Sequence, residues 1–344
     1  EHAWAAYDAA GARLAAAPGP DTSMAAVADA LEAAARPDGA TADGETVAWL
    51  PMIEAWEGPV ICAAEARGIS LRDWHANALE GRNLTFPGGL GDFVARRLGP
   101  GAGDIRLGTP ATAIAWSGHG VTVTTPMGPI EGCAAIVTVS TAVLAREAIR
   151  FTPALPAHVL QAASDLPLGL ALKVALRAAG PDRLGLPPFT TLDRQIATRG
   201  EAFAIFNVWP YGRDHAIAWV GGDTAWTLAR AGARAAQDFA LAEIKHMLGS
   251  RAAALFTDEV IVTGWDRDPL IGGVYSNARP GAADARRVLA APLADGRLVF
   301  AGEACHVGFA GTVAGAWHSG ERAARHVAAA LTPGSLSPPV TPPP

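Results

Sequence analysis

The chain lacks the residue patterns of several common protein classes. It has only three cysteines in 344 residues, far apart and odd in number, so neither a disulfide framework nor a metal site is expected, and a reducing cytoplasm fits. No apolar run reaches about 18 residues, the length that a membrane-spanning helix needs. The 27 basic residues form no run longer than two and the net charge is −6, which argues against a nucleic-acid-binding surface.

Two further motifs are absent. Dinucleotide-binding domains place a Gly-x-Gly-x-x-Gly turn after a strand and at the start of a helix, and no such site occurs here. The nearest candidate, Gly99–Gly103, precedes the strand expected around Ile105 and contains a proline where helix-opening amides would be needed, so we predict a surface loop. Ser, His and Asp residues form no nucleophile motif, which disfavours a hydrolase.

The composition indicates a large folded core. Half of the residues are apolar, only 17% are charged, and the length suits two intertwined domains better than one. The predicted helices cover 22–35 (with a Thr or Ser N-cap), 51–68, 69–74 (another short cap and helix), 84–98 (after a turn) and 226–248. The predicted strands cover 105–107, 111–116, 121–125, 130–139 and 258–265, together with 202–209 and 215–220, which are expected to form a hairpin. The proline-rich end, 333–344, is expected to be an extended or disordered tail.

The most informative segment runs from Arg297 to Ala324. Its residues 298–300 predict a short buried strand that Gly302 ends, and a helix is expected to begin near Val313. Small residues crowd the helix start: Gly311, Thr312, Ala314, Gly315 and Ala316. A flat ligand can therefore approach the first backbone N–H groups, where the helix dipole favours an electron-rich edge such as N1 and O2 of a flavin.

This segment strongly resembles the C-terminal signature of the flavin-containing amine oxidases, the family of monoamine oxidases, polyamine oxidases and lysine-specific histone demethylases. The resemblance covers nearly the whole chain, most strongly 84–176 and 260–327. It implies a mixed α/β fold in which an FAD-binding Rossmann-like domain, incomplete in this chain, is interleaved with a substrate domain of sheet and helices. The implied bounds are 1–84 (helical part of the substrate domain), 85–162 (FAD domain), 163–266 (substrate domain), 267–332 (C-terminal part of the FAD domain) and 333–344 (tail).

The missing glycine turn has a consequence for the partners. Because the family holds the FAD pyrophosphate with that turn, the resemblance implies that the first FAD-binding segment is supplied by a separate small subunit or by a cleaved fragment that stays bound, or is simply absent. A cytoplasmic location is the expectation, although that segment could also carry a signal.

Lys173 is the strongest single candidate for a catalytic residue. It lies in the apolar segment 166–177, where burying an ammonium costs several kcal/mol unless it is paired or deprotonated. A solvent-facing lysine is one interpretation. By the resemblance, Lys173 is instead a catalytic residue that bonds a water lying against flavin N5 and helps the reduced flavin to pass electrons to O2.

The segment 265–276 carries the Trp-x-x-Asp-Pro and Gly-x-Tyr-Ser pattern of the polyamine oxidase and demethylase branch. By the resemblance, Trp265 packs near the lysine and the flavin, and Tyr275 aligns the amine on the substrate side; core packing of Tyr275 is the alternative. Val274 stands where monoamine oxidases carry the cysteine bonded to FAD, so a noncovalent cofactor is expected. Thr312 stands where they carry a second tyrosine, which disfavours a mammalian-type monoamine.

The resemblance also implies the FAD contacts. Glycines at 88 and 89 let the backbone approach the flavin, the backbone at Ala111 pairs with the adenine edge, and Glu303 lies against the ribityl–pyrophosphate portion. The full set is Gly88, Gly89, Ala111, Gly302, Glu303, Gly311, Thr312, Val313 and Gly315. His306 and His318 flank the helix without a metal-ligand spacing.

We therefore expect an FAD-dependent amine oxidase that acts as a complex with an N-terminal FAD-binding polypeptide. A hydride would pass from the α-carbon of the amine to flavin N5, the imine would hydrolyse, and O2 would reoxidise the flavin and yield H2O2. Two alternatives stay open: an L-amino-acid oxidase or another FAD-dependent dehydrogenase or desaturase, and a truncated, non-enzymatic module that acts through protein contacts.

Overall fold

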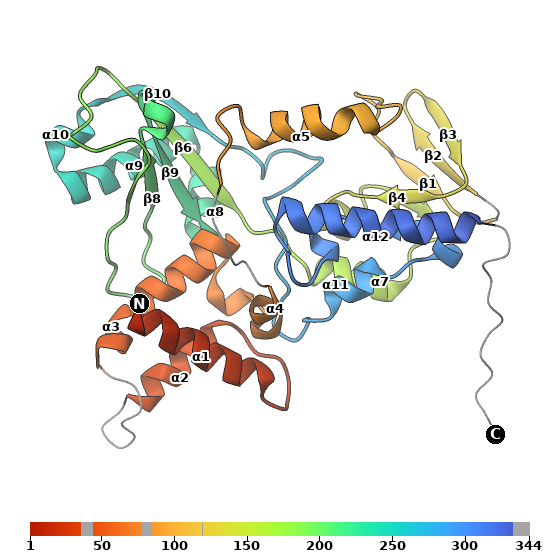
Figure 1. Cartoon of the computed structure of the whole chain (residues 1–344), viewed down its shortest axis with the longest axis horizontal. Helices are drawn as coiled ribbons and strands as arrows, with labels where there is room; N and C mark the ends of the chain where they lie inside the picture. Colours follow the sequence, from red (N-terminus) through yellow and green to blue (C-terminus); the bar gives the residue numbers. More distant parts are fainter. Residues whose placement is uncertain (36–43, 78–83, 119, 333–344) are drawn as a thin grey trace.

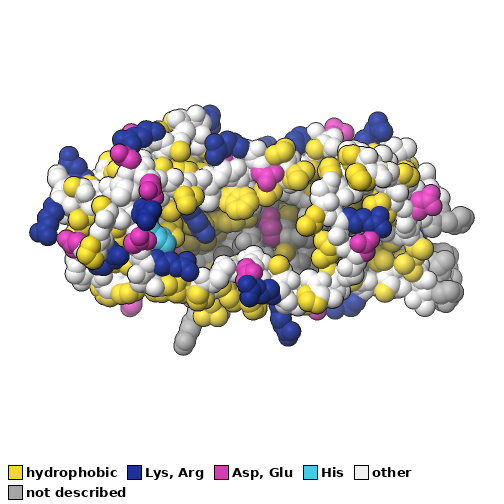
Figure 2. Space-filling model, turned by 90° about the horizontal axis from the view of Figure 1, so that it is seen from above, with side chains coloured by type: hydrophobic (Ala, Val, Ile, Leu, Met, Phe, Trp, Pro, Cys, Tyr) yellow, Lys and Arg dark blue, Asp and Glu magenta, His cyan; other side chains and the backbone are white. Residues whose placement is uncertain are grey.

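The computed structural model describes residues 1–35, 44–77, 84–118 and 120–332, so the predicted tail 333–344 lies outside the described residues. Figure 1 shows two lobes side by side. The left lobe holds α1–α4, β6–β10 and α8–α10, and the right lobe holds β1–β5, β11, α6, α7, α11 and α12. Helix α5 runs above α12 in this view, and the space-filling view from above shows a hollow between the lobes (Figure 2).

The helices are α1 (His2–Ala16), α2 (Ala25–Ala34), α3 (Gly44–Ala55), α4 (Leu71–Ala76), α5 (Leu90–Leu98), α6 (Thr141–Ala145), α7 (Ala157–Ser164), α8 (Gly222–Ala231), α9 (Ala233–Leu248), α10 (Ser250–Ala253), α11 (Ala285–Ala290) and α12 (Val313–Leu331), with a π-helix η1 (Trp56–Cys62). The strands are β1 (Ala113–Ala115), β2 (Val121–Thr125), β3 (Gly128–Gly132), β4 (Ala135–Val137), β5 (Arg150–Thr152), β6 (Ala171–Ala178), β7 (Thr190–Leu192), β8 (Ile205–Val208), β9 (His215–Gly221), β10 (Phe256–Val262) and β11 (Leu298–Phe300).

The strands of the described residues form three sheets. The left lobe has a five-stranded antiparallel sheet in the order β10-β6-β9-β8-β7. The right lobe has a four-stranded sheet, β3-β2-β1-β5, and a two-stranded parallel sheet in which β11 pairs with β4 in register Val299 to Ile136. Each lobe has its own main core: one cluster gathers side chains from 114–166 and 278–305, and the other gathers side chains from 170–262. The segments of the two cores therefore interleave along the chain.

Several predictions from local patterns are confirmed. Strand β2, strand β11 and the start of α12 lie where the sequence predicts them, and β8 and β9 form the predicted hairpin. Ser70 caps α4 by accepting a hydrogen bond from the Asp73 amide, the contact that a serine at this position commonly makes. The segment 99–103 is an exposed loop with a short 3-10 turn.

Three predictions about individual helices and strands are wrong. Residues 105–107 form no strand but an exposed turn beside Gly108, whose φ of +64° turns the chain away. The helix expected over 226–248 is broken into α8 and α9 at Gly232, where φ is +95°. The strand expected over 130–139 is two short strands, β3 and β4, that belong to different sheets.

The N-terminal region is helical as predicted, but its bounds differ. Helix α3 begins at Gly44 and runs through Pro51, which the prediction takes as a helix start because proline favours the first turn. The residue before α2 is Met24, and no side chain caps that helix. Ser23 forms an isolated β-bridge to Ser70 instead, so the expected Thr or Ser cap is absent.

The π-helix η1 packs so closely on the end of β9 that only glycine fits there. A Cβ built on Gly221 would lie 1.6 Å from the carbonyl oxygen of Pro59, and one built on Gly169 would lie 2.5 Å from the carbonyl oxygen of Ala63. Both neighbours are backbone atoms, which cannot swing aside as a side chain does. The two glycines therefore allow η1 to pack closely against the sheet of the left lobe.

This contact predicts a matched pair of glycine substitutions. Gly221→Ala should destabilise the fold by about 1–3 kcal/mol, because overpacking forces the backbone of η1 away from β9. Gly180→Ala should have little effect, since nothing lies within 4 Å of a Cβ at that exposed position. Urea denaturation followed by tryptophan fluorescence measures both, and equal midpoints for the two variants would contradict the predicted close approach.

Candidate functional site

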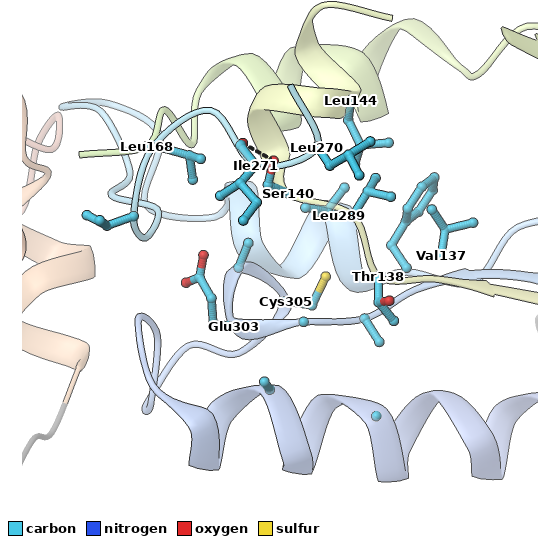
Figure 3. A pocket seen from close by; sticks show the side chains of 18 residues that line it. Val137, Thr138, Ser140, Leu144, Leu168, Leu270, Ile271, Leu289, Glu303 and Cys305 are labelled. Carbon is cyan, nitrogen blue, oxygen red and sulfur yellow. Dashed lines mark hydrogen bonds between the residues drawn. The ribbon is translucent and has the colours of Figure 1, made fainter. Parts of the chain in front are cut away.

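A cavity of about 430 Å³ opens at the carboxyl ends of the parallel strands β4 and β11. Residues 138–140, which follow β4, and residues 302–305, which follow β11, line it together with Leu168, Ile271 and Leu289. In Figure 3, Glu303 and Cys305 reach into this space from the segment after β11, and Ser140 bonds the carbonyl oxygen of Ile271. The crevice outside the carboxyl ends of parallel strands is the usual ligand site of α/β sheets.

The chain reverses after β11 through Gly302. Its φ of +135° is a conformation that glycine adopts at little cost, and no atom lies within 4 Å of a Cβ built there. The hydroxyl of Ser319, a fully buried residue of α12, accepts from the Gly302 amide and donates to the Gly302 carbonyl oxygen, both at 2.8 Å. Ser319 was not predicted, because a lone serine on a small-residue helix gives no signal in the sequence.

Glu303 is held by the protein itself. Its carboxylate accepts hydrogen bonds from the backbone amide (3.0 Å) and hydroxyl (2.9 Å) of Ser276 and from the amide of Gly311 (2.8 Å). These bonds tie the turn after β11 to the loop that leads into α12. In this structure Glu303 thus has a positioning role, and its predicted contact with a cofactor stays a prediction.

A buried ion pair lies behind Glu303. The guanidinium of Arg286 donates to both carboxylate oxygens of Asp73, at 2.8 and 2.9 Å, and also to the hydroxyl and carbonyl oxygen of Ser276. Arg286 is 2% exposed, and one of its nitrogens lies 3.9 Å from a Glu303 oxygen. No sequence pattern indicates this network, because Asp73 and Arg286 are 213 residues apart.

The start of α12 has the form that the small residues predict. The Thr312 hydroxyl caps the helix by accepting from the Gly315 amide at 2.9 Å, and it donates to the Phe309 carbonyl oxygen at 2.7 Å. Within the described part of the chain, no acceptor bonds the amides of Val313 or Ala314. Two N–H groups at the positive end of the helix dipole are therefore available to a ligand.

The structural reason for a glycine at position 315 differs from the predicted one. A Cβ there would lie 2.0 Å from the carbonyl oxygen of Phe309, so the turn before α12 itself requires glycine. A larger residue would disturb this turn whether or not a cofactor binds. The predicted contact of Gly315 with FAD is therefore neither needed to explain this residue nor excluded.

The expected burial of Lys173 is wrong. Strand β6 alternates, and its side chains Leu172 and Val174 enter the left-lobe core while Lys173 lies exposed on the opposite face. The ammonium lies 5.1 Å from the ring centroid of Trp219, a cation–π contact, and the Trp219 indole donates to the Val60 carbonyl oxygen of η1 at 3.1 Å. The alternation of the strand was visible in the sequence, but the face that the core would cover was not.

Tyr275 lies against another predicted site residue, Gly311. Its hydroxyl donates to the Ile61 carbonyl oxygen of η1 at 2.7 Å, and its ring packs against Gly311, where a Cβ would lie 3.4 Å from the ring. Burial raises the pKa of Tyr275 above its ordinary value, so the phenol stays protonated at neutral pH. Because Val60 and Ile61 are adjacent, η1 connects Tyr275 with the Trp219–Lys173 contact.

The remaining predicted residues are dispersed. Trp265 is 46% exposed and follows Thr263, whose amide donates to the Lys173 carbonyl oxygen at 3.1 Å. Gly88 and Gly89 lie in the exposed turn before α5, and Ala111 precedes β1 in the right lobe. None of these four residues lines the cavity at β4 and β11.

Two further features are absent from the described residues. No three His, Cys, Asp or Glu side chains in the described ranges come together as a metal ion would need. In those same ranges, no helix combines the length and the apolar character that crossing a membrane demands.

The fold and the cavity together define a mixed α/β protein with a cavity at the carboxyl edge of a parallel sheet, the usual position of a ligand site in such folds. A model of the family described as flavin containing amine oxidoreductase matches residues 21–328. The chain belongs to this family, which confirms the resemblance of its C-terminal signature and its mixed fold class.

Individual relatives agree. The chain is 31% identical over 287 residues to polyamine oxidase 4 of Oryza sativa subsp. japonica (82% of this chain, 56% of the rice protein) and 27% identical over 286 residues to lysine-specific histone demethylase 2 of Homo sapiens (78% and 34%). It thus spans about half of the rice protein and a third of the human one. A putrescine oxidase bound to putrescine has the same fold, with a TM-score of 0.71 at 18% identity over 94% of this chain and 73% of that one.

The buried ion pair yields a stability prediction. Arg286→Met should cost about 3–5 kcal/mol, because it leaves the Asp73 carboxylate buried without a cation. Arg287→Met is the matched control, since its guanidinium is exposed and, among the described residues, pairs with Asp284 one turn away, a contact worth at most about 1 kcal/mol. Thermal denaturation of both variants measures the difference, and similar losses would rule out a special role for the buried pair.

Proposed function

We propose that this chain forms most of an FAD-dependent amine oxidase. The observation that carries the proposal is the cavity at the carboxyl ends of β4 and β11, with the glycine turn at 302 on one side and the two free amides of α12 beside it, in a chain of this family. A bound flavin would accept a hydride from the α-carbon of the amine, leaving an imine that hydrolyses, and would pass two electrons to O2 to form H2O2.

The residues present fit part of such a cofactor. Gly302, Ala316 and Gly320 add almost no side-chain volume to the cavity, so a flat group can slide between the end of β11 and α12. The amides of Val313 and Ala314 offer donors to an electron-rich ring edge. The phosphate-binding glycine turn is missing from the 344 residues, so the pyrophosphate must be held by other groups.

The same residues support a noncovalent cofactor. Cys305 is the cysteine that lines the cavity, and burial raises the pKa of its thiol to about 12. A protonated thiol is a poor nucleophile, so Cys305 is not suited to bond a ring carbon. The position before Tyr275 is Val274, which has no nucleophilic atom at all.

We propose three roles for the substrate side. Tyr275 presents its ring beside Gly311 and its protonated hydroxyl holds η1, so the ring can align an amine without exchanging a proton with it. Lys173 supplies a positive charge that Trp219 keeps in place, and we propose that it holds the water that assists reoxidation. Trp265, exposed here, would pack over the lysine once the cofactor side is complete.

A further FAD-binding segment is also part of the proposal. In the described residues β4 and β11 form a sheet of only two strands, and parallel sheets of that size are rarely stable alone. Helix α5 buries no side chain and exposes Leu90, Phe93 and Leu98, and Ile136 of β4 is exposed too. We propose that one segment covers these surfaces, carried either by the same polypeptide or by a separate small subunit.

The cofactor proposal predicts a simple chemical result. The native protein should show the absorption bands of a flavin, and acid denaturation should release all of that flavin into the supernatant, because neither Cys305 nor Val274 is suited to a covalent bond. Flavin that precipitates with the protein would contradict noncovalent binding, and a native protein without flavin bands would contradict the oxidase itself.

The lysine proposal predicts a specific kinetic defect. Lys173→Met should lower peroxide formation from an amine by about 100-fold, the size expected for one lost preorganised charge, while the flavin content stays unchanged. Lys245→Met is the control, since Lys245 is the other lysine of the chain and lies exposed near the end of α9. A peroxide assay with amines and with L-amino acids measures both variants; oxidation of amino acids alone would favour an amino-acid oxidase.

A further inference from the structure

A histidine in the loop between β11 and α12 holds part of that loop through one ring nitrogen. The Nδ1 atom of His306 accepts hydrogen bonds from the backbone amide of Gly308, at 3.1 Å, and from that of Phe309, at 3.0 Å. In the described part of the chain, neither amide has another acceptor. The shape of the turn 306–309 therefore depends on a single side-chain atom.

These two bonds fix the protonation state of the His306 ring. A nitrogen that accepts from N–H groups carries no proton, so the neutral imidazole has its proton on Nε2. In an imidazolium both nitrogens are donors, and a proton on Nδ1 would face the two backbone N–H groups. One added proton would therefore break both hydrogen bonds and replace them by repulsion.

The surroundings of His306 disfavour that proton. Its ring centroid lies 5.4 Å from the Phe309 ring and 6.0 Å from the His318 ring. Burial lowers the pKa of His306 below its ordinary value, and the positive charges of Arg322 and of a protonated His318 lower the pKa further. The neutral ring is therefore the form that the folded protein favours at neutral pH.

The carboxylates of the neighbouring elements are engaged elsewhere. Helix α12, the turn after β11 and helix α4, which approaches Gly308 through the Ala76 carbonyl oxygen, each carry one: Glu321, Glu303 and Asp73. Their partners are His318 at 3.6 Å, the Ser276 hydroxyl at 2.9 Å and Arg286 at 2.8 Å. His75, on α4, is exposed. Among these described groups, no carboxylate raises the pKa of His306.

The turn 306–309 leads directly into the start of α12. The Phe309 carbonyl oxygen accepts from the Thr312 hydroxyl, which caps the helix, at 2.7 Å. A Cβ built on Gly315 would lie 2.0 Å from the same oxygen, so the turn and the first turn of the helix are in close contact. A displaced Phe309 would therefore disturb the cap and, with it, the two free amides of α12.

We propose that His306 is a positioning residue that holds the start of α12 only in its neutral form, so that one proton releases the turn 306–309 and weakens cofactor binding at the helix start. The cofactor part rests on the proposed function, whereas the part about the turn rests on the hydrogen bonds alone. The bonds need the neutral ring. Their contribution to stability is complete above the ordinary histidine pKa of about 6.5 and is lost as the pH falls through the lower pKa of the folded state.

The first experiment measures the turn in the native protein without substrate. Hydrogen exchange of the Gly308 and Phe309 amides is compared at about pH 8 and about pH 5, the range in which histidine changes its charge, after correction for the intrinsic pH dependence of exchange. Protection of both amides should fall about tenfold in acid, the loss expected for two broken hydrogen bonds.

Three variants separate the proton from the side chain. His306→Asn places a non-titrating acceptor near the position of Nδ1, so protection should persist at both pH values. His306→Leu has no acceptor and should lose protection at both. His326→Asn, at an exposed position farther along α12, is the control and should follow the native protein. Protection that is independent of pH in the native protein, or that survives in His306→Leu, would overturn the inference.

The second experiment measures the dissociation constant of the flavin at the same two pH values. It should rise about tenfold in acid for the native protein and for His326→Asn, and should rise less for His306→Asn. Equal rises in the native protein and in His306→Asn would refute the link between the turn and the cofactor. If the native protein holds no flavin, the proposed oxidase fails, and hydrogen exchange still decides the role of His306.

Discussion

The buried guanidinium of Arg286 is the constraint on which the site depends. An unpaired charge in the core costs several kcal/mol, so the chain must bring acceptors to Arg286 from separate segments: the Asp73 carboxylate from α4 and the hydroxyl and carbonyl oxygen of Ser276. Ser276 in turn donates to Glu303, and Glu303 accepts from Gly311. One buried cation thereby fixes the left-lobe helices, the residue after Tyr275 and the loop that opens α12 relative to one another.

The C-terminal carbonyl groups of the π-helix η1 hold side chains from other segments. The last carbonyl groups of a helix have no partner within it, and here three successive carbonyl oxygens, those of residues 60–62, accept from the side chains of Trp219, Tyr275 and Asn277. Ala63 then leaves the helix in a left-handed conformation, with φ of +54°. The carbonyl groups at the end of η1 thus position two aromatic side chains, Trp219 beside Lys173 and Tyr275 beside Gly311.

Structural features that depend on residues close together in the sequence could be predicted. The cap at Ser70, the strand β11 and the start of α12 follow from patterns within a few residues, and all are confirmed. Contacts between distant segments left no such pattern. The Asp73–Arg286 pair was missed, and the exposed face of β6 was misjudged because alternation gives two faces without saying which one a core will cover. The cofactor and catalytic roles themselves stay predictions.

The described residues enclose the surroundings of Tyr275 more completely than the cofactor side at β4, β11 and α5. Around Tyr275, the bond to the Ile61 carbonyl oxygen and the contact with Gly311 come from described residues. Around β4, β11 and α5, strand edges and apolar side chains stay uncovered. If one further segment binds FAD there, ordering it must bury Leu90, Phe93 and Ile136 together, so cofactor binding and assembly would be a single linked equilibrium. The bond that holds Tyr275 on η1, by contrast, is formed by this chain alone.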